Sequence, residues 1–203
     1  MRVIGLTGNI GSGKSTVSRR LKKLGAAALD TDRIARDVVA PGTPGLDLIV
    51  KTFGNHVLTP EGELDRAKMG DMVFKDPGAR AKLEAIVHPL IFREVVKKID
   101  EYKSGHNTAP AMVVEVPLLI ESGMHRLMDE IWLVAVNPEI QLNRIMSRDK
   151  LSPEQAFQRM NSQMPQEKKI EFATKIIENN GTPEETEARV DELWQEIARD
   201  HAK

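Results

Sequence analysis

Short apolar runs alternate along the chain with longer segments in which apolar residues recur at helical spacing. The runs are rich in Val, Ile, Leu and Ala and mostly free of charge, as expected for strands of a sheet that is covered on both faces. This alternation predicts an α/β fold with a largely parallel sheet. The predicted strands cover residues 2–7, 26–30, 112–116, 131–136 and 175–178.

Helices are predicted between and after these strands, over residues 14–24, 139–148, 153–163 and 184–199. Gly25 suits the C-terminal cap of the first helix. Thr182, Pro183 and Glu185 fit the N-cap, the first helical position and the capping-box partner of the last one.

The stretch between the second and third predicted strands, residues 33–110, is far longer than a simple crossover requires. Pro and Gly residues divide it into segments of helical pattern. We interpret it as a helical insertion that binds a substrate, although the same helices would also complete a core. The segments are residues 34–40, 44–53, 64–74, 77–87 and 89–102.

Composition narrows the classes of function. The 203 residues include no cysteine, which excludes disulfides and thiolate metal sites, and the formal net charge is −1. This charge gives no broad positive field, so neither a nucleic acid nor an acidic membrane is expected as a partner. No apolar run reaches membrane-spanning length and the first residues do not form a signal peptide, so we expect a cytoplasmic protein.

Residues 8–15, GNIGSGKS, match the pattern G-x-x-x-x-G-K-[ST] at every fixed position. Glycines let several backbone N–H groups converge on a polyphosphate, and the following helix directs its N-terminus at the anion. Lys14 would contact the β- and γ-phosphates, Ser15 would bind Mg²⁺, and Thr16 would lie nearer the α-phosphate. The predicted nucleotide-binding residues are Gly8, Asn9, Ile10, Gly11, Ser12, Gly13, Lys14, Ser15 and Thr16.

Two aspartates lie at the end of the second predicted strand, Asp30 as its last residue and Asp32 two residues beyond, at the edge of the sheet where ligands bind in parallel α/β folds. Asp32 could accept a proton from an acceptor hydroxyl in phosphoryl transfer, or it could cap the next helix. Asp30 could support Mg²⁺ through water, orient the acceptor, or simply be a solvated loop residue. The guanine-recognition motif N-K-x-D is absent, which argues against a GTPase.

Beyond the loop, the chain resembles the dephospho-CoA kinase family. The stretches that carry the resemblance fall in that family's order and span nearly the whole chain: GLTGNIGSGKST, DTDRIARDVVAPGTPGL, HPLI, VPLLIESG, QLNRIMSRD and IIENNG. The family phosphorylates the ribose 3′-hydroxyl of dephospho-CoA with ATP. The resemblance implies a P-loop NTPase-type parallel sheet flanked by helices, with a core of about residues 1–32, 111–138 and 172–203. A helical CoA-binding insertion (about 33–110) and a helical lid (about 139–171) would complete it.

The resemblance also implies roles for individual residues. Asp32 matches the family's general base. The acceptor would contact Asp30, Asp32, Ile34, His88, Pro89, Pro117, Leu118 and Glu121. Taken alone, a histidine before a proline, as at His88, more often marks the boundary of a helix than a ligand.

Arginines of the lid would close over the triphosphate, since a guanidinium can hold two phosphate oxygens. Arg144, Arg148 and Arg159 are the candidates, with Arg144 also a catalytic one, and each could instead be a solvated surface residue. Asn179, after the last predicted strand, matches a family position near the adenine, or it is an ordinary residue that stops a helix. Glu115 and Thr174 stand where the family usually has Asp.

The expected reaction is therefore transfer of the γ-phosphoryl group of ATP, with Mg²⁺, to dephospho-CoA. Another small-metabolite or nucleoside-monophosphate kinase is the alternative within the enzyme class. A nucleotide-dependent switch is the alternative outside it, and it would show no turnover stimulated by an acceptor. We expect a monomer or a weak homo-oligomer.

Overall fold

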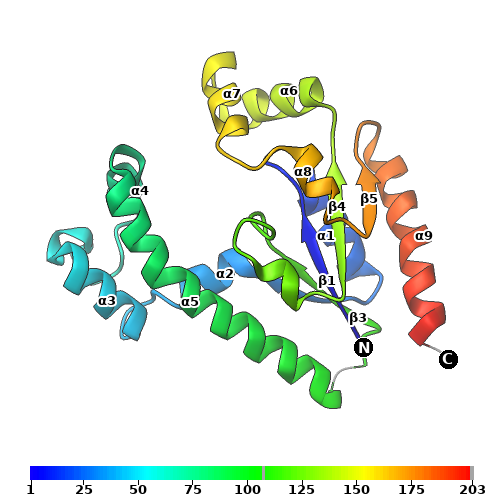
Figure 1. Cartoon of the computed structure of the whole chain (residues 1–203), viewed down its shortest axis with the longest axis horizontal. Helices are drawn as coiled ribbons and strands as arrows, with labels where there is room; N and C mark the ends of the chain where they lie inside the picture. The colour runs from blue at the N-terminus through cyan, green and yellow to red at the C-terminus, as the bar shows by residue number, and fades with distance from the viewer. Residues whose placement is uncertain (107, 202–203) are drawn as a thin grey trace. The chain divides into compact units, whose positions relative to one another are not determined.

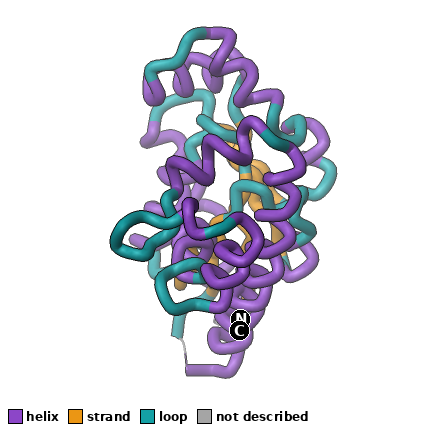
Figure 2. The backbone as a smooth tube through the Cα atoms, turned by 90° about the vertical axis from the view of Figure 1, so that its left-hand side faces the viewer, coloured by secondary structure: helices purple, strands orange, loops and turns teal. Residues whose placement is uncertain are grey.

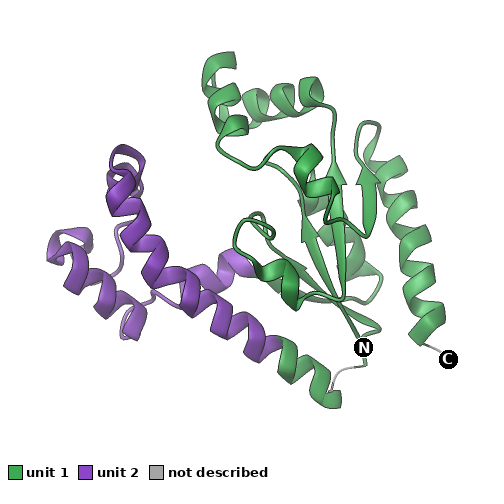
Figure 3. Cartoon of the chain, viewed as in Figure 1, with its two compact units in different colours: residues 1–30, 99–203 green, residues 31–98 purple. Residues whose placement is uncertain are grey.

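The computed structural model describes residues 1–106 and 108–201. It divides into two compact units, which Figure 3 shows in different colours. Unit 1 comprises Met1–Asp30 and Ile99–Lys203, and unit 2 comprises Thr31–Lys98. The domain limits expected from the sequence, 33–110 for the insertion and 139–171 for the lid, stay predictions.

Unit 1 contains a five-stranded parallel sheet with the strand order β2-β3-β1-β4-β5 (Figure 1). All five strands lie within one residue of their predicted ends, and they are drawn in orange in Figure 2. The predicted parallel α/β fold is therefore confirmed. The strands are β1 (Arg2–Thr7), β2 (Ala27–Asp30), β3 (Ala111–Glu115), β4 (Glu130–Ala135) and β5 (Lys175–Glu178).

Helices cover the sheet of unit 1. Helix α1 (Lys14–Lys23) and helix α9 (Pro183–His201) pack on one face, where the buried side chains of Leu21 and Trp194 join strand residues such as Ile4. The other face is so close to the segment after β3 that a Cβ at Gly5 would lie 2.7 Å from Leu119. The remaining helical elements of this unit are η2 (Tyr102–His106), η3 (Met124–Leu127), α6 (Pro138–Asp149), α7 (Pro153–Asn161) and α8 (Gln166–Ile170).

The predicted capping box at the start of α9 is confirmed. The backbone N–H of Thr182 donates to Glu185 Oε2 at 2.8 Å, and the N–H of Glu185 donates to Thr182 Oγ1 at 3.3 Å. Two of the N–H groups that a helix leaves unpaired are thereby satisfied.

Unit 2 is helical, with α2 (Thr31–Asp37), α3 (Pro44–Phe53), η1 (Asn55–Val57), α4 (Arg66–Lys75) and α5, whose Pro77–Glu101 span ends in unit 1. Thr43 caps α3 by accepting from Leu46 N at 3.3 Å, and Asp65 caps α4 by accepting from Lys68 N at 3.0 Å. A separate small core holds the unit together, made of Val39, Ile49, Val57 and Met69.

The two helices predicted over 77–87 and 89–102 are wrong as separate elements, because α5 runs through Pro89. Proline removes one backbone hydrogen bond and costs about 3 kcal/mol inside a helix. Apolar side chains before it, including Leu83 and Val87, pack against the core of unit 2, and Val95 beyond it is buried. Packing along both halves offsets the local cost and keeps the helix continuous.

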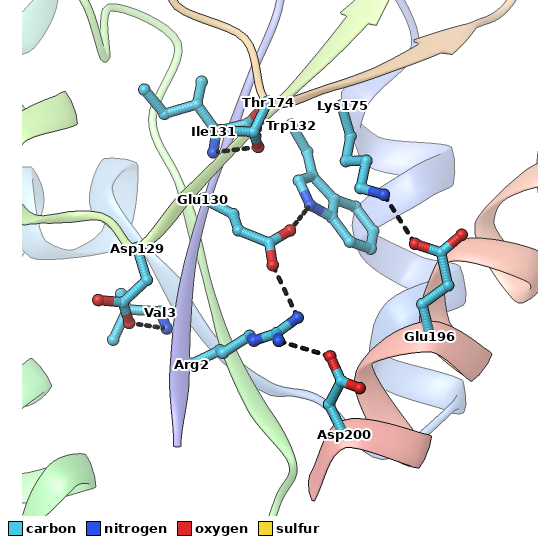
Figure 4. A network of polar contacts seen from close by, with 10 residues as sticks. All are labelled: Arg2, Val3, Asp129, Glu130, Ile131, Trp132, Thr174, Lys175, Glu196 and Asp200. Atoms are coloured by element: carbon cyan, nitrogen blue, oxygen red, sulfur yellow. Dashed lines mark hydrogen bonds and ion pairs between the residues drawn. The ribbon is translucent and has the colours of Figure 1, made fainter.

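The amino-terminal edge of the sheet is joined by polar contacts (Figure 4). The Arg2 guanidinium donates to Glu130 Oε1 at 2.9 Å and to Asp200 Oδ2 at 2.6 Å, which ties β1 to β4 and α9. Thr174 Oγ1 accepts from Ile131 N and donates to Ile131 O, each at 3.0 Å. The hydroxyl of Thr174 thus aligns the start of β5 with β4.

Within the described part of the chain, no helix is both long and apolar enough to cross a lipid bilayer.

Candidate active site

The segment between β1 and α1 is a phosphate-binding loop in its backbone geometry. Gly13 adopts a φ of 94°, and a Cβ at this position would lie 1.9 Å from Asn179 Nδ2. A Cβ at Gly8 would lie 2.6 Å from the carbonyl oxygen of Val134. The glycines of the motif are therefore required by close approaches as well as by backbone conformation.

The N-terminus of α1 is open for an anion. Its N-cap residue is Gly13, which has no side chain to cap the helix, and its first turn carries no acidic residue. Lys14 Nζ donates to the carbonyl oxygens of Gly8 and Asn9, at 2.7 and 3.2 Å. The ammonium group thus lies over the loop, while Ser15, the second residue of the helix, is exposed. The N-terminal end of the helix dipole and the ammonium group of Lys14 converge at the loop as a polyphosphate requires.

Side chains from distant parts of unit 1 fix the loop. Gln141 Nε2 donates to the carbonyl of Ile10 at 2.8 Å, and the N–H of Ile10 donates to Gln163 Oε1 at 2.7 Å. Asn9 Nδ2 donates to the carbonyl of Met164 at 3.2 Å. The sequence pattern does not predict these roles of Gln141 and Gln163. The only signal is that Gln141 is a polar residue at a position of α6 that faces inward.

Asn179 lies beside the phosphate loop and is buried. Its Nδ2 donates to the carbonyl of Ser12 at 2.7 Å, and its Oδ1 accepts from Thr186 Oγ1 at 2.8 Å. The amide therefore stabilises the loop through a threonine that the sequence did not single out. The expected contact of Asn179 with adenine stays a prediction.

Arg144 on α6 brings a guanidinium to the loop. Its Nη1 is buried, has no hydrogen-bond partner among the described residues, and lies 3.8 Å from the position that a Cβ of Gly13 would take. The hydroxyl of Ser12 is buried and unpartnered in the same sense. Buried donors without partners are rare in folded proteins, and here they indicate a ligand at the loop.

Arg148 and Arg159 differ from Arg144, because both bind Asp149. Arg148 donates through two nitrogens, at 2.7 and 2.9 Å, and Arg159 Nη1 lies 2.9 Å from Asp149 Oδ2. The hydrogen bond from Arg148 holds the pKa of the Asp149 carboxyl below its ordinary value, and raises the pKa of Arg148. These arginines are joined to one carboxylate in this structure, so their predicted phosphate contacts stay predictions.

Two acidic residues end neighbouring strands at the carboxyl edge of the sheet. Asp30 pairs in register with Glu115, and Glu115 pairs with Leu6 of β1, just before the phosphate loop. This arrangement puts both acidic positions at the edge that carries the loop. Asp32 follows two residues after Asp30, as the second residue of α2, and is exposed.

The segment after β3 lies next to the start of the loop. Thr7 Oγ1 donates to the carbonyl of Pro117 at 3.3 Å, and the side chain of Leu118 is exposed. The carboxylate of Glu121 is engaged within the protein, with Oε1 2.8 Å from Lys169 Nζ. Its predicted contact with an acceptor stays a prediction.

Unit 2 contains a cavity of about 400 Å³. Ile34 from the predicted acceptor segment lines it, and Leu90 and Arg93 line it from α5. His88 and Pro89 directly precede Leu90 in that helix. The other lining residues are Asp37, Val38, Thr43, Pro44, Gly45, Glu94 and Lys98.

In residues 1–106 and 108–201 the structure contains no cluster of three or more His, Asp or Glu side chains suited to a metal ion. Mg²⁺ commonly uses one or two protein ligands together with substrate phosphates and water. Ser15 beside the phosphate loop fits that mode of binding, since its hydroxyl follows Lys14 at the exposed start of α1.

Comparisons of the chain with known proteins indicate a single family. A sequence model of the family described as dephospho-CoA kinase matches residues 2–185. The curated dephospho-CoA kinase of Symbiobacterium thermophilum is 46% identical over 195 residues, which cover 96% of this chain and 81% of that protein.

Two solved structures extend the comparison. Dephospho-CoA kinase from Campylobacter jejuni has a TM-score of 0.76 at 30% identity, and the match covers 98% of both chains. Shikimate kinase from Acinetobacter baumannii, at 18% identity, has a TM-score of 0.57 over 100% of this chain and 96% of its own, and this likeness concerns the fold alone. By family model, sequence identity and structure together, the chain belongs to the dephospho-CoA kinase family.

Proposed function

We propose that the chain transfers the γ-phosphoryl group of ATP in line to the ribose 3′-hydroxyl of dephospho-CoA, with Asp32 as the general base. The kinase activity and its place as the final step of coenzyme A synthesis follow from membership of the family. The observation that carries the proposal is the phosphate loop with the buried, unpartnered Nη1 of Arg144 beside Gly13.

ATP would bind with its β- and γ-phosphates at the loop. Lys14 Nζ would then exchange its bonds with the carbonyls of Gly8 and Asn9 for phosphate oxygens, and Arg144 would supply a second cation. These fixed charges favour the transition state because they are already oriented before charge develops on the transferring group. Mg²⁺, held by Ser15 and the phosphates, would neutralise charge on the nucleotide.

Asp32 would orient the acceptor hydroxyl and accept its proton. Its place in the chain supports this role, since it follows the carboxyl end of β2 by two residues, and that end lies at the same sheet edge as the loop. Asp30 would support Mg²⁺ through water or orient the acceptor. Glu115, which pairs in register with Asp30, would reach Mg²⁺ through water.

The acceptor would use the cavity of unit 2. Ile34 and Leu90 offer apolar contacts, and Arg93 offers a cation suited to the diphosphate of dephospho-CoA. His88 and Pro89 would contribute from the turn of α5 that precedes Leu90. The contacts of the acceptor with Pro117 and Leu118 stay predictions from the sequence. Closure of Arg148 and Arg159 over the triphosphate would exclude water, which competes as an acceptor. We further propose a cytoplasmic enzyme that is a monomer or a weak homo-oligomer.

A coupled assay of ADP release tests the acceptor. The purified chain is given ATP and Mg²⁺ with dephospho-CoA, AMP, shikimate or gluconate, and a reaction without acceptor measures background hydrolysis. We expect turnover with dephospho-CoA to exceed that with the other acceptors by at least two orders of magnitude. A preference for another acceptor would favour a different small-metabolite kinase, and turnover that no acceptor stimulates would favour a nucleotide-dependent switch.

A further inference from the structure

Helix α8 contains a buried lysine to which the proposed reaction assigns no role. The side chain of Lys169 is 0% exposed, whereas its neighbour Lys168 is exposed. Burial of an ammonium group is unfavourable unless the charge is paired and hydrogen-bonded. The ammonium group of Lys169 can therefore be buried only because other groups of the protein bind it.

Both partners of Lys169 belong to the segment after β3. Nζ lies 2.8 Å from Glu121 Oε1, and it donates to the carbonyl of Pro117 at 3.4 Å. One ammonium group thus joins α8 to two points of this segment.

The same atoms connect onward to the phosphate loop. The carbonyl of Pro117 also accepts from Thr7 Oγ1 at the end of β1, at 3.3 Å. Glu121 Oε1 also accepts from the N–H of Met164 at 3.3 Å, and the carbonyl of Met164 accepts from Asn9 Nδ2 at 3.2 Å. The pair of Lys169 and Glu121 therefore links α8, the segment after β3 and the residues around Met164. The hydrogen bonds of these segments to Thr7 and Asn9 connect the pair to the phosphate loop.

We propose that Lys169, together with Glu121, is a positioning residue for ATP binding. The pair fixes Met164 and the adjacent Gln163. The side chain of Gln163 accepts a hydrogen bond from the N–H of Ile10. The conformation of the loop at Asn9 and Ile10 thus depends on a charge pair that lies outside the loop itself. The inference rests on the proposed binding of ATP at this loop, and it gives Glu121 a role separate from acceptor contact.

Lys169→Met tests the inference, because Met keeps the apolar stem and removes the ammonium group. We expect ATP affinity, titrated without any acceptor, to fall about tenfold. Amide hydrogen exchange in residues 163–170 and 6–10 should rise at the same time. Lys168→Met removes the same charge from an exposed site and should change neither quantity. Since no acceptor is present, an error in the assignment of Asp32 or of dephospho-CoA would leave this result unaffected.

Two further variants keep the test decisive if Lys169→Met fails to fold. The double change Lys169→Met with Glu121→Leu removes both charges and leaves neither buried alone, which favours folding. It should still show the tenfold loss and the faster exchange. Glu121→Gln leaves the buried ammonium group of Lys169 without a charged partner, and should also lower the ATP affinity. Normal affinity and normal exchange in the folded double variant would overturn the proposal.

Discussion

At the scale of single residues, the phosphate loop depends on positions where no side chain fits. Gly13 and Gly25 have nearly the same positive φ, 94° and 98°. A Cβ at Gly13 would lie 1.9 Å from Asn179 Nδ2, whereas a Cβ at Gly25 would have no atom within 4 Å. A side chain at Gly25 would therefore cause backbone strain alone, whereas a side chain at Gly13 would cause the strain and also a clash with Asn179.

Alanine at each of these glycines gives a matched prediction. Gly25→Ala should lower the free energy of unfolding by about 1 kcal/mol and leave ATP binding unchanged. Gly13→Ala should abolish most ATP binding, since Asn179 must move away from the loop. Thermal melting and calorimetric titration with ATP measure the two effects. Equal ATP affinity in both variants would contradict the role given to the contact at Gly13.

At the scale of elements, α9 stabilises the loop from a distance. Its capping box fixes where the helix begins, and one turn later Thr186 donates to Asn179, which donates to the carbonyl of Ser12. Thr182 and Thr186 thus have different tasks in the same helix. Thr182 stabilises the helix, and Thr186 orients a group that contacts the site.

Valine at the two threonines tests this division. Thr182→Val removes the cap and should cost about 1 kcal/mol of unfolding free energy with the KM for ATP unchanged. Thr186→Val leaves Asn179 Oδ1 without its donor, and should cost about 1–2 kcal/mol. The KM for ATP should also rise several-fold in this second variant only. A rise of similar size in both variants, or in neither, would show that Asn179 is not oriented through Thr186.

The sequence predicts those features that are formed by residues close to one another along the chain. The motif at residues 8–15 and the capping box at Thr182 each lie within a few residues, and the structure has both. Gln141 and Lys169 could not be found in that way, since their partners Ile10 and Pro117 lie 131 and 52 residues away. Local preference also misplaced a helix boundary at Pro89, where packing along the whole of α5 prevails.

At the scale of the whole molecule, a charge pair joins the first and last helices of unit 1. The Arg20 guanidinium of α1 donates to both carboxylate oxygens of Asp191 in α9, with Nε 2.6 Å from Oδ1. The hydrogen bond from Arg20 holds the pKa of Asp191 below its ordinary value of 3.8. A carboxyl with a lowered pKa in the folded state contributes stability above its unfolded pKa and loses it as the pH falls through the folded one.

Asp191→Asn should therefore lower the Tm by a constant amount between about pH 5 and pH 8. The difference from the unmodified protein should shrink as the pH falls below 3.8 and then through the lowered pKa of folded Asp191, because the carboxyl is protonated first in the unfolded chain and only at lower pH in the folded protein. Melting followed by circular dichroism across this range measures it. A difference that grows towards low pH would contradict the assigned direction of the pKa.

The proposed reaction draws on both units, since the phosphate loop belongs to unit 1 and Asp32 to unit 2. The most direct test is the kcat of Asp32→Asn with saturating ATP and dephospho-CoA, measured beside its affinity for ATP. Loss of a general base should lower kcat by about a hundredfold or more, while ATP affinity stays close to that of the unmodified protein. If Asp32→Asn instead keeps most of its turnover, another group accepts the proton of the 3′-hydroxyl.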